Sequence, residues 1–581
     1  MKKITDNVFL YKDTCNVYII KDNDSAVLID FGSGGVMDYL KDIGINKISA
    51  VLITHHHRDQ VQGLTSDFNI FVPHNEQDFF TYANEYWISR EILNNYNSRQ
   101  DRFTLLNSIK ISGTLIDYSN FKIGNISFYI IPTPGHTTGS ISIKININEQ
   151  EIFFTGDLIY QAGKIWSLAA TQWNYNGGEG LPYTVLSLLH LYENSNNSCL
   201  LLPSHGEPMD KTAINPTIDN ILELIKLRRH NPNLLKLREN PYEIITPHVL
   251  RNRTSMSDSY VLISNSGKSL IIDFGYDFIA GIPPGVERSS RRPWAYTVPK
   301  LFKQYGIKQI DACIPTHYHD DHVAGMNLLK SIYNTKIICS DIFADILENP
   351  NDYDIPCLWY DPIDVNMRVS SSFDWEEYNI KLHHLPGHTK YAVAIEFIAD
   401  GKKFLCGGDQ YADSDGLEIN YVYKNIFFSN DYVKTAELYN NIKPDIMLTG
   451  HSGAIKFTQE YYNKILQRGK KTEVLHDKLL PYKDFGNSFL AVFKPYSVFV
   501  KSGETFEARI IITNPKNHNI EFDLYMPDDF EAISKQISST EFKIMVKTPT
   551  RQMYRERIAC DICINGTKFG QQAEMLVYST I

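Results

Sequence analysis

Residues 313–325 read CIPTHYHDDHVAG, and residues 51–63 read VLITHHHRDQVQG. In both stretches a short apolar run ends in Thr-His and passes into a dense group of His and Asp side chains. Imidazole nitrogens and carboxylate oxygens are ligands that divalent transition metals take from proteins. The two stretches therefore predict two metal sites at strand ends, and their likeness indicates an internal duplication.

Other landmarks recur in the same order in the two halves of the chain. The members of each pair lie between about 240 and 265 residues apart, so the repeated unit is a whole domain. Strand-like runs end at these residues and alternate with helical patterns, which indicates a layered α/β architecture. The matched pairs are Asp30 and Asp273, His55 and His317, His136 and His388, Asp157 and Asp409, and His205 and His451.

After about residue 480 the pattern changes to short apolar runs separated by Pro, Gly, Asn and Asp. About a hundred residues of this kind fit a small β-sandwich of the immunoglobulin-like type. We therefore predict three domains, at 1–236, 237–476 and 484–581.

The composition is that of an ordinary globular protein. Of 581 residues, 43% are hydrophobic and 21% are charged, and the net charge of −10 leaves no broad basic face for nucleic acid. Eight cysteines are too sparse for a disulfide framework, and neither a secretory signal nor an apolar run of 18 residues is visible. We expect a reduced cytoplasmic protein with no membrane partner and no nucleic-acid partner.

The second copy carries the denser ligand set. In an extended or turn conformation alternate residues face one way, so His317 and His319 can serve one metal while Asp321 and His322 serve a neighbour. His388, in a Gly-flanked turn, can complete the first of these sites and His451 the second. Asp409, at a strand end, can bridge the two.

The series THxHxDH, PGHT, a strand-ending Gly-Asp and a Gly-flanked His resembles the metallo-β-lactamase superfamily. The resemblance covers nearly all of residues 1–475 as two tandem copies. It implies two αββα sandwiches, each with its metals at one edge between the sheets. In the second copy it implies His317, His319 and His388 on one metal, Asp321, His322 and His451 on the other, and Asp409 as the bridge, with Asp273 as a supporting residue.

The first copy departs from the family pattern at one position. Gln60 stands where the family has His and where the second copy has His322, and an amide oxygen is a poor zinc ligand beside imidazole. His56 is expected to face away from the metal. Three interpretations stay open for this copy: one metal, two metals with the second weakly held, or an idle structural or regulatory module. The residues that match the pattern are His55, His57, Asp59, His136, Asp157 and His205.

The family implies a metal-dependent hydrolase acting on an ester, thioester, lactone, amide or phosphodiester bond. Two adjacent cations would activate a water and polarise the scissile group, with Asp321 and Asp409 as the catalytic carboxylates. We predict zinc, two ions in domain 2 and one or two in domain 1, with iron or manganese as alternatives. An iron oxidoreductase of the dioxygenase type is the second class of function, and a binding module is the third.

The substrate residues are predicted from two departures in the second copy. A longer loop at 282–297 carries Arg288, Arg291 and Arg292, which could grip an anionic small molecule; the alternative is a solvated loop or a contact to another domain. Lys390 and Tyr391 replace the small residues that follow PGHT in the family. By analogy with homodimeric relatives, we also expect either a pseudo-dimer of the tandem domains or a homo-oligomer.

Overall fold

The computed structural model describes residues 1–84, 103–171, 180–227, 233–281, 291–293, 295–419, 423–425, 428–479, 490–512 and 519–580. Its contacts divide the chain into two compact units. Unit one comprises Met1–Pro241 and Asp277–Lys300, and unit two comprises Tyr242–Tyr276 and Leu301–Ile581. The sequence analysis assigned 277–300 to the second domain, and the structure corrects this by grouping the segment with unit one.

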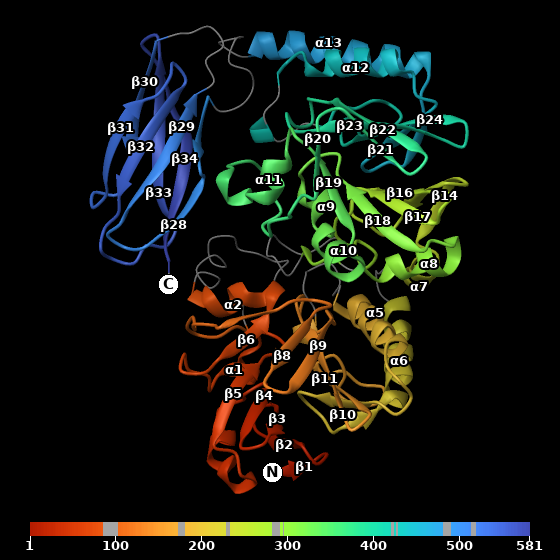
Figure 1. Cartoon of the computed structure of the whole chain (residues 1–581), viewed down its shortest axis with the longest axis vertical. Coiled ribbons are helices and arrows are strands. Elements are labelled where there is room, and N and C mark those ends of the chain that lie inside the picture. The colour runs from red at the N-terminus through yellow and green to blue at the C-terminus, as the bar shows by residue number, and fades with distance from the viewer. Residues whose placement is uncertain are drawn as a thin grey trace. The chain divides into compact units, whose positions relative to one another are not determined.

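Unit one contains a seven-stranded sheet and a six-stranded sheet, each with its strands in chain order (Figure 1). The first sheet consists of β1 (Lys2–Lys3), β2 (Val8–Lys12), β3 (Asn16–Asp22), β4 (Ser25–Ile29), β5 (Lys47–Leu52), β6 (Ile70–Pro73) and β7 (Gly113–Leu115). The second consists of β8 (Asn120–Ile123), β9 (Ile126–Pro132), β10 (Ile141–Ile147), β11 (Gln150–Gly156), β12 (Leu200–Pro203) and β13 (Met209–Asp210).

Helices cover the outer faces of both sheets. The α-helices are α1 (Arg58–Val61), α2 (Gln77–Thr81), α4 (Leu168–Thr171), α5 (Gly180–Glu193), α6 (Ile214–Lys226) and α7 (Leu234–Glu239). The 3₁₀ helices are η1 (Gly35–Tyr39), η2 (Lys41–Ile43), η3 (His74–Glu76), η5 (Lys211–Ala213) and η7 (Ala295–Thr297).

The alternation of side chains along the strands produces the layers. In β3, Tyr18 and Ile20 join an apolar cluster formed by both sheets, whereas Val17 and Ile19 join a cluster that includes residues of η1, α1 and α2. Successive strand residues point to opposite faces, so an uninterrupted apolar strand must be covered on both sides. On the outer face of the second sheet a third cluster packs α5 and α6. Unit one is therefore an αββα sandwich.

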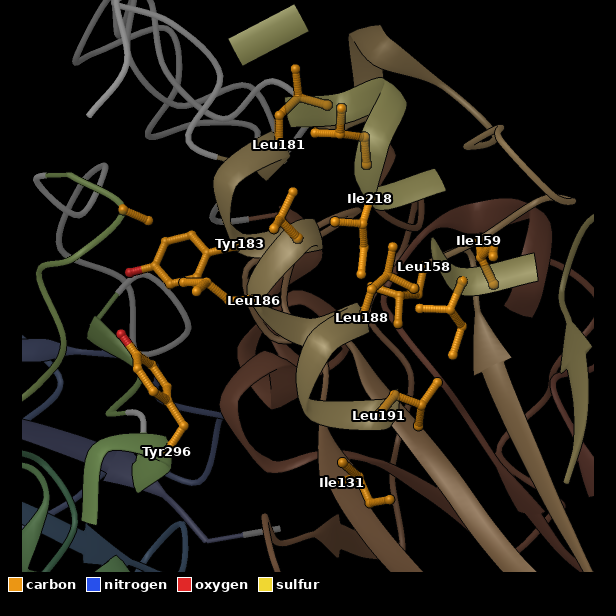
Figure 2. Close-up of a cluster of buried hydrophobic side chains, with 14 of the residues drawn as sticks. Ile131, Leu158, Ile159, Leu181, Tyr183, Leu186, Leu188, Leu191, Ile218 and Tyr296 are labelled. Atoms are coloured by element: carbon orange, nitrogen blue, oxygen red, sulfur yellow. The ribbon is translucent and has the colours of Figure 1, made fainter. Parts of the chain in front are cut away.

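Residues 277–300 join unit one through this third cluster. Ile279, Ala280 and Tyr296 are buried in it, and Figure 2 shows Tyr296 across from Tyr183 of α5. The Tyr296 hydroxyl also donates to Asp277 Oδ2 at 2.9 Å. Burial of these apolar side chains explains why the segment packs with the first unit although the second half of the chain encodes it.

Unit two repeats the two-sheet arrangement. Its seven-stranded sheet consists of β14 (Tyr242–Thr246), β15 (Val249–Asn252), β16 (Ser259–Ile263), β17 (Lys268–Ile272), β18 (Gln309–Ile314), β19 (Lys336–Ser340) and β20 (Met367–Val369). Its six-stranded sheet consists of β21 (Ser372–Trp375), β22 (Tyr378–His384), β23 (Val393–Ala399), β24 (Lys402–Gly408), β25 (Ile446–Thr449) and β26 (Ala454–Lys456).

The helices of the second half follow the same plan. α10 packs on β18 and β19, while α12 and α13 share an apolar cluster with residues of β23, β24 and β25. The helices are α8 (Val298–Tyr305), α9 (Asp320–Val323), α10 (Met326–Tyr333), α11 (Ala344–Glu348), η8 (Pro350–Asp352), η9 (Tyr423–Asn425), α12 (Asp431–Ile442) and α13 (Gln459–Leu479).

The C-terminal region forms two four-stranded sheets. Burial alternates strictly along β29, and the inward side chains of both sheets share one apolar cluster. The immunoglobulin-like topology stays a prediction. The strands are β27 (Ala491–Lys494), β28 (Ser497–Val500), β29 (Thr505–Ile512), β30 (Ile520–Tyr525), β31 (Glu531–Gln536), β32 (Glu541–Lys547), β33 (Glu556–Ile564) and β34 (Thr567–Ser579).

Candidate metal centres

Pairs of parallel strands bring the predicted ligands together. In unit two, β17 runs parallel to β18 and β24 runs parallel to β25. Asp273, His317, Asp409 and His451 all follow the carboxyl ends of these strands. Unit one repeats the arrangement with β4 beside β5 and β11 beside β12. Because the ends of neighbouring parallel strands lie at one sheet edge, residues far apart in sequence converge there.

The first ligand group of the second cluster consists of His317, His319, His388 and Asp409, all buried. Their ligand atoms all lie within 4.8 Å of one another. His388 Nε2 is 3.1 Å from His319 Nδ1 and 3.6 Å from Asp409 Oδ2. Among the described residues, His317 Nε2 has no hydrogen-bond partner although it is buried. A cation between these atoms would satisfy it.

The second ligand group contains Asp321, His322, Asp409 and His451. His322 Nε2 lies 3.2 Å from Asp409 Oδ1, and His451 Nε2 lies 3.1 Å from Asp409 Oδ2 and 3.4 Å from Asp321 Oδ2. Asp409 therefore belongs to both groups. The seven side chains predicted from the sequence are all brought together, and their donor set fits two divalent cations.

Three carboxylates create a field that favours positive charge here. Burial alone would lower the pKa of His322, but Asp409, Asp273 and Asp321 raise it well above its usual value. The hydrogen bond to Asp409 and that carboxylate's charge likewise raise the pKa of His451 to about 9 against burial. A field that attracts a proton to imidazole also attracts a metal cation, and the cation releases that proton when it binds.

Buried polar contacts orient the rings of the candidate ligands. Asp273 Oδ2 lies 3.0 Å from His322 Nδ1, which directs the other ring nitrogen toward Asp409. His388 Nδ1 lies 2.6 Å from the Ile419 carbonyl and therefore presents Nε2 to the cluster. The supporting role expected for Asp273 agrees with this geometry.

Asn425 is a supporting residue that the sequence analysis did not identify. Its Oδ1 lies 3.1 Å from His319 Nε2 and accepts from the Tyr318 hydroxyl at 3.0 Å. Its carbonyl accepts from Thr389 Oγ1 and from Lys390 N. It lies far along the chain in η9, outside every recognisable motif, so only the tertiary structure reveals it.

Two glycines allow the strand ends to approach. Gly408 has a φ of +52°, and a Cβ there would lie 2.7 Å from Thr316 Oγ1. A Cβ on Gly450 would lie 1.8 Å from Asp409 Oδ1. The Asp409 carboxylate can therefore occupy its place only because position 450 has no side chain.

The first cluster contains the corresponding triad of His55, His57 and His136, all buried. His136 Nε2 is 2.9 Å from His57 Nδ1 and 3.5 Å from Asp157 Oδ2, and His55 Nε2 is 3.6 Å from the same oxygen. Burial lowers the pKa of His55 to about 3, which keeps the ring neutral as a metal ligand must be. Among the described residues, His55 Nε2 has no hydrogen-bond partner.

Within the part of the chain that the structure describes, the second group of this cluster has three members, Asp59, Asp157 and His205. The His205 ring lies differently from that of its counterpart. Its Nδ1 is 2.8 Å from Asp157 Oδ1, and its Nε2 is 3.0 Å from the Thr14 carbonyl and 3.3 Å from Asp59 Oδ2. The ring stacks on Trp166 with centroids 4.0 Å apart.

Gln60 occupies the place of the missing histidine. It is fully buried, its Nε2 is 3.3 Å from Asp59 Oδ2, and among the described residues its Oε1 has no hydrogen-bond partner. Asp30, the counterpart of Asp273, instead accepts from Ser204 Oγ at 2.6 Å. Without an imidazolium beside it, burial raises the pKa of Asp30 to about 7. The surroundings of position 60 thus also differ from those of His322.

His56 points away from the triad, in agreement with the sequence analysis. Its backbone amide donates to Glu76 Oε2 at 2.8 Å, its Nδ1 lies 3.1 Å from the same oxygen, and its ring stacks on Phe79. It supports the loop and joins neither ligand group.

Of the three arginines predicted to bind substrate, Arg292 is already engaged in buried hydrogen bonds. Arg292 is buried in unit one, where its guanidinium bonds Asp117 and the carbonyls of Thr138 and Ser140. This corrects the substrate-binding prediction for Arg292 and favours the alternative of a contact to another domain, because its donors are already engaged. Arg291 is half-buried, and Arg288 lies outside the described residues.

Lys390 and Tyr391 lie beside the His388 turn. Lys390 is exposed and lines a cavity of about 340 Å³ together with His384, Phe428 and Lys434. The Lys390 ammonium lies 5.4 Å from the Tyr391 ring centroid. The cavity lining contains none of the seven ligands. A substrate role for this pair stays a prediction.

Comparisons with known proteins agree with this geometry. The family model described as the metallo-beta-lactamase superfamily matches residues 10–196 and 253–409, more than half of the chain. An uncharacterized protein of Mycobacterium tuberculosis is 25% identical over 207 residues, which cover 33% of this chain and 86% of that protein. A probable metallo-hydrolase of Methanocaldococcus jannaschii is 28% identical over 212 residues, which cover 35% of this chain and 93% of that protein.

Among solved structures, the metallo-beta-lactamase GOB-18 from Elizabethkingia meningoseptica shows 16% identity and a TM-score of 0.31. It matches 41% of this chain and 93% of its own. A HARLDQ motif mutant of a metallo-beta-lactamase from Cronobacter sakazakii has the same identity and TM-score and is covered over 99% of its length. No described helix combines the length and apolar character that a membrane crossing requires.

Proposed function

The chain belongs to the metallo-β-lactamase superfamily, and from that premise we propose that it is a metal-dependent hydrolase whose main catalytic centre is the second cluster. The observation that carries the proposal is the convergence of seven side chains into two ligand groups that share Asp409. The first cluster lacks one imidazole of this set. The printed name of the M. jannaschii relative, a probable metallo-hydrolase, points the same way.

The role proposed for each residue follows from its position in the cluster. His317, His319 and His388 would hold one cation, and Asp321, His322 and His451 the other, with Asp409 between them. When bound, two such cations supply an activated water and polarise the scissile group. Asp321, at the edge of the cluster, would orient the attacking water and move its proton to the leaving group.

We propose zinc as the metal, two ions in the second cluster and one in the first. Zinc suits mixed imidazole and carboxylate ligands, as do iron and manganese. For the first cluster, a weakly held second ion and an idle structural or regulatory module are the alternatives to a single ion. Its complete His55, His57 and His136 triad favours metal binding.

The proposed substrate is a small molecule with an ester, thioester, lactone, amide or phosphodiester bond. Lys390 gives the neighbouring cavity a positive charge, which favours an anionic group. We further propose a cytoplasmic protein whose C-terminal sheets make contacts with its own domains or a partner chain. An intramolecular pseudo-dimer or a homo-oligomer would suit the duplicated sandwiches.

The second candidate is an iron-dependent oxidoreductase of the dioxygenase type. The observation in its favour is the first cluster. With Gln60 in place of a fourth imidazole, His55, His57 and His136 form a group that could hold one metal ion. Such a centre suits a single iron as well as a single zinc. Metal identity separates the two candidates.

The test is elemental mass spectrometry on protein purified without chelator or added metal, followed by hydrolysis assays with chromogenic esters and phosphodiesters. Three zinc ions per chain and activity that is lost to chelation and restored by zinc would support the proposal. Two zinc ions that persist in a His57→Ala/His136→Ala variant would restrict it to the second cluster. Iron as the dominant metal, with no hydrolysis, would overturn it.

A further inference from the structure

Arg292 is a buried cation close to the first cluster, and it belongs to the 277–300 segment. Its side chain is only 3% exposed. Nε and Nη2 donate to the two oxygens of Asp117 at 2.7 and 2.5 Å. Nη1 donates to the Ser140 carbonyl at 2.8 Å and lies 3.4 Å from the Thr138 carbonyl. One guanidinium therefore joins a carboxylate to two backbone carbonyls.

Those two carbonyls belong to the turn that carries His136. Glu76 holds the same turn through different atoms, because its Oε1 accepts from Thr137 Oγ1 at 2.6 Å and from Gly139 N at 2.9 Å. Two buried charged side chains therefore hold the turn. Glu76 accepts hydrogen bonds from its donor groups, and Arg292 donates hydrogen bonds to its carbonyl oxygens. His136 completes the triad with His55 and His57.

The corresponding turn of unit two is anchored in another way. There the Asn425 carbonyl accepts from Thr389 Oγ1 at 3.1 Å and from Lys390 N at 3.3 Å. Thr389 and Lys390, the counterparts of Thr137 and Thr138, therefore have a local partner that comes from their own sandwich. Unit one takes its anchor from a segment that follows β17 in the chain.

We propose that Arg292 is a positioning residue of the first cluster, which fixes the His136 turn, and that this metal site is complete only when residues 277–300 pack on unit one. The proposal rests on the proposed function in one respect, that the first cluster binds a metal. Without the guanidinium, the Asp117 carboxylate would be buried without its cation and two turn carbonyls would lose their donor. The freed turn would hold His136 less accurately. Loss of supporting contacts of this kind costs about 10–100-fold in metal affinity.

The experiment uses the full chain with cobalt(II) as the probe. The variant His319→Ala/His322→Ala/Asp409→Ala serves as the parent, because it leaves only two ligands in each group of the second cluster. The visible absorption spectrum and the dissociation constant of cobalt are then compared with and without Arg292→Gln. Arg238→Gln is the matched control, since Arg238 is equally buried in unit one but pairs with Glu193 and Glu239.

We expect Arg292→Gln to shift the cobalt absorption bands and to weaken binding by at least about tenfold, while Arg238→Gln changes neither. Unaltered spectrum and affinity in Arg292→Gln would overturn the proposal, as would an equal loss in Arg238→Gln. If Arg292→Gln does not fold, Arg292→Lys is measured by the same criteria, because one ammonium cannot join Asp117 to both carbonyls. Failure of the parent to bind cobalt would instead refute the proposed metal site itself.

Discussion

The two clusters share one plan but differ at two linked positions and in the partner of the matched aspartate, Asp30 or Asp273. Where unit two has His322, Gly450 and Asp273 in contact with that histidine, unit one has Gln60, Ser204 and an Asp30 bonded to the serine. Gly450 leaves room for Asp409, and Ser204 supplies the hydroxyl that Asp30 needs once its imidazole partner is gone. The difference teaches that, where a histidine is absent from the ligand set, the aspartate that would orient it has a different partner.

The largest expected effect is the difference in turnover between substitutions of His319 and His57, which occupy matching positions in the two clusters. His319→Ala removes a ligand of the complete cluster and should lower turnover of a chromogenic ester by more than about 100-fold, beyond the cost of losing a supporting contact. His57→Ala at the matching position should leave more than about half of the turnover, because the complete cluster is untouched. Equal losses in steady-state assays would contradict the proposed asymmetry.

Substitutions at position 322 and at its counterpart, position 60, should change how many metal ions each cluster binds. His322→Gln should remove about one zinc ion per chain and lower turnover by at least about tenfold, the lower bound for loss of a supporting contact. Gln60→His combined with Ser204→Gly should add about one ion, since it recreates the ligand and frees Asp30 to orient it. Elemental analysis measures both changes. An unchanged zinc content in both variants would show that position 60/322 does not determine occupancy.

Asn425 provides a finer test in the second cluster. Asn425→Ala should weaken zinc binding by about tenfold, because His319 Nε2 and the Tyr318 hydroxyl lose their acceptor. Asn425→Asp keeps an acceptor oxygen and should stay within about threefold of the wild type. Chelator competition gives both affinities, and identical values for the two variants would dismiss the ring-orienting role.

The smallest expected effect concerns the cavity beside the His388 turn. Lys390→Ala should raise KM for an anionic ester by about two- to fivefold, the range of an exposed charge interaction, and leave KM for a neutral ester unchanged. Lys434→Ala is the control, because Lys434 lines the same cavity but is bonded to Asp431. Equal responses to neutral and anionic esters would remove Lys390 from the substrate site.

The local motifs predicted the ligand groups because strand ends and tight turns fix where such side chains point. THYHDDH lies between β18 and the first turn of α9, so its His and Asp side chains are confined to the end of the sheet. The duplication, a layered α/β architecture and the isolation of His56 could be predicted on the same grounds, whereas the two-sheet sandwich was implied by the family resemblance. They depend on period-two alternation and short-range geometry, which the sequence displays directly.

The role of Asn425 and the partners of Arg292 could not be predicted, because no local pattern indicates either. Asn425 reaches His319 across more than a hundred residues, and Arg292 reaches the His136 turn from the other half of the chain. An arginine in a loop of unknown path is equally suited to substrate, solvent or protein. Its role follows from the carboxylate and carbonyls it meets.

The sequence by itself determined the family resemblance, the tandem copies and the candidate metal ligands, since each rests on residue types at short fixed spacings. Only the tertiary structure decided that residues 277–300 belong to unit one, that Asn425 contacts the His319 ring, and that Arg292 contacts the His136 turn. The physical reason is that burial and long-range hydrogen bonds depend on which segments fold together, and that pairing is a property of the whole chain.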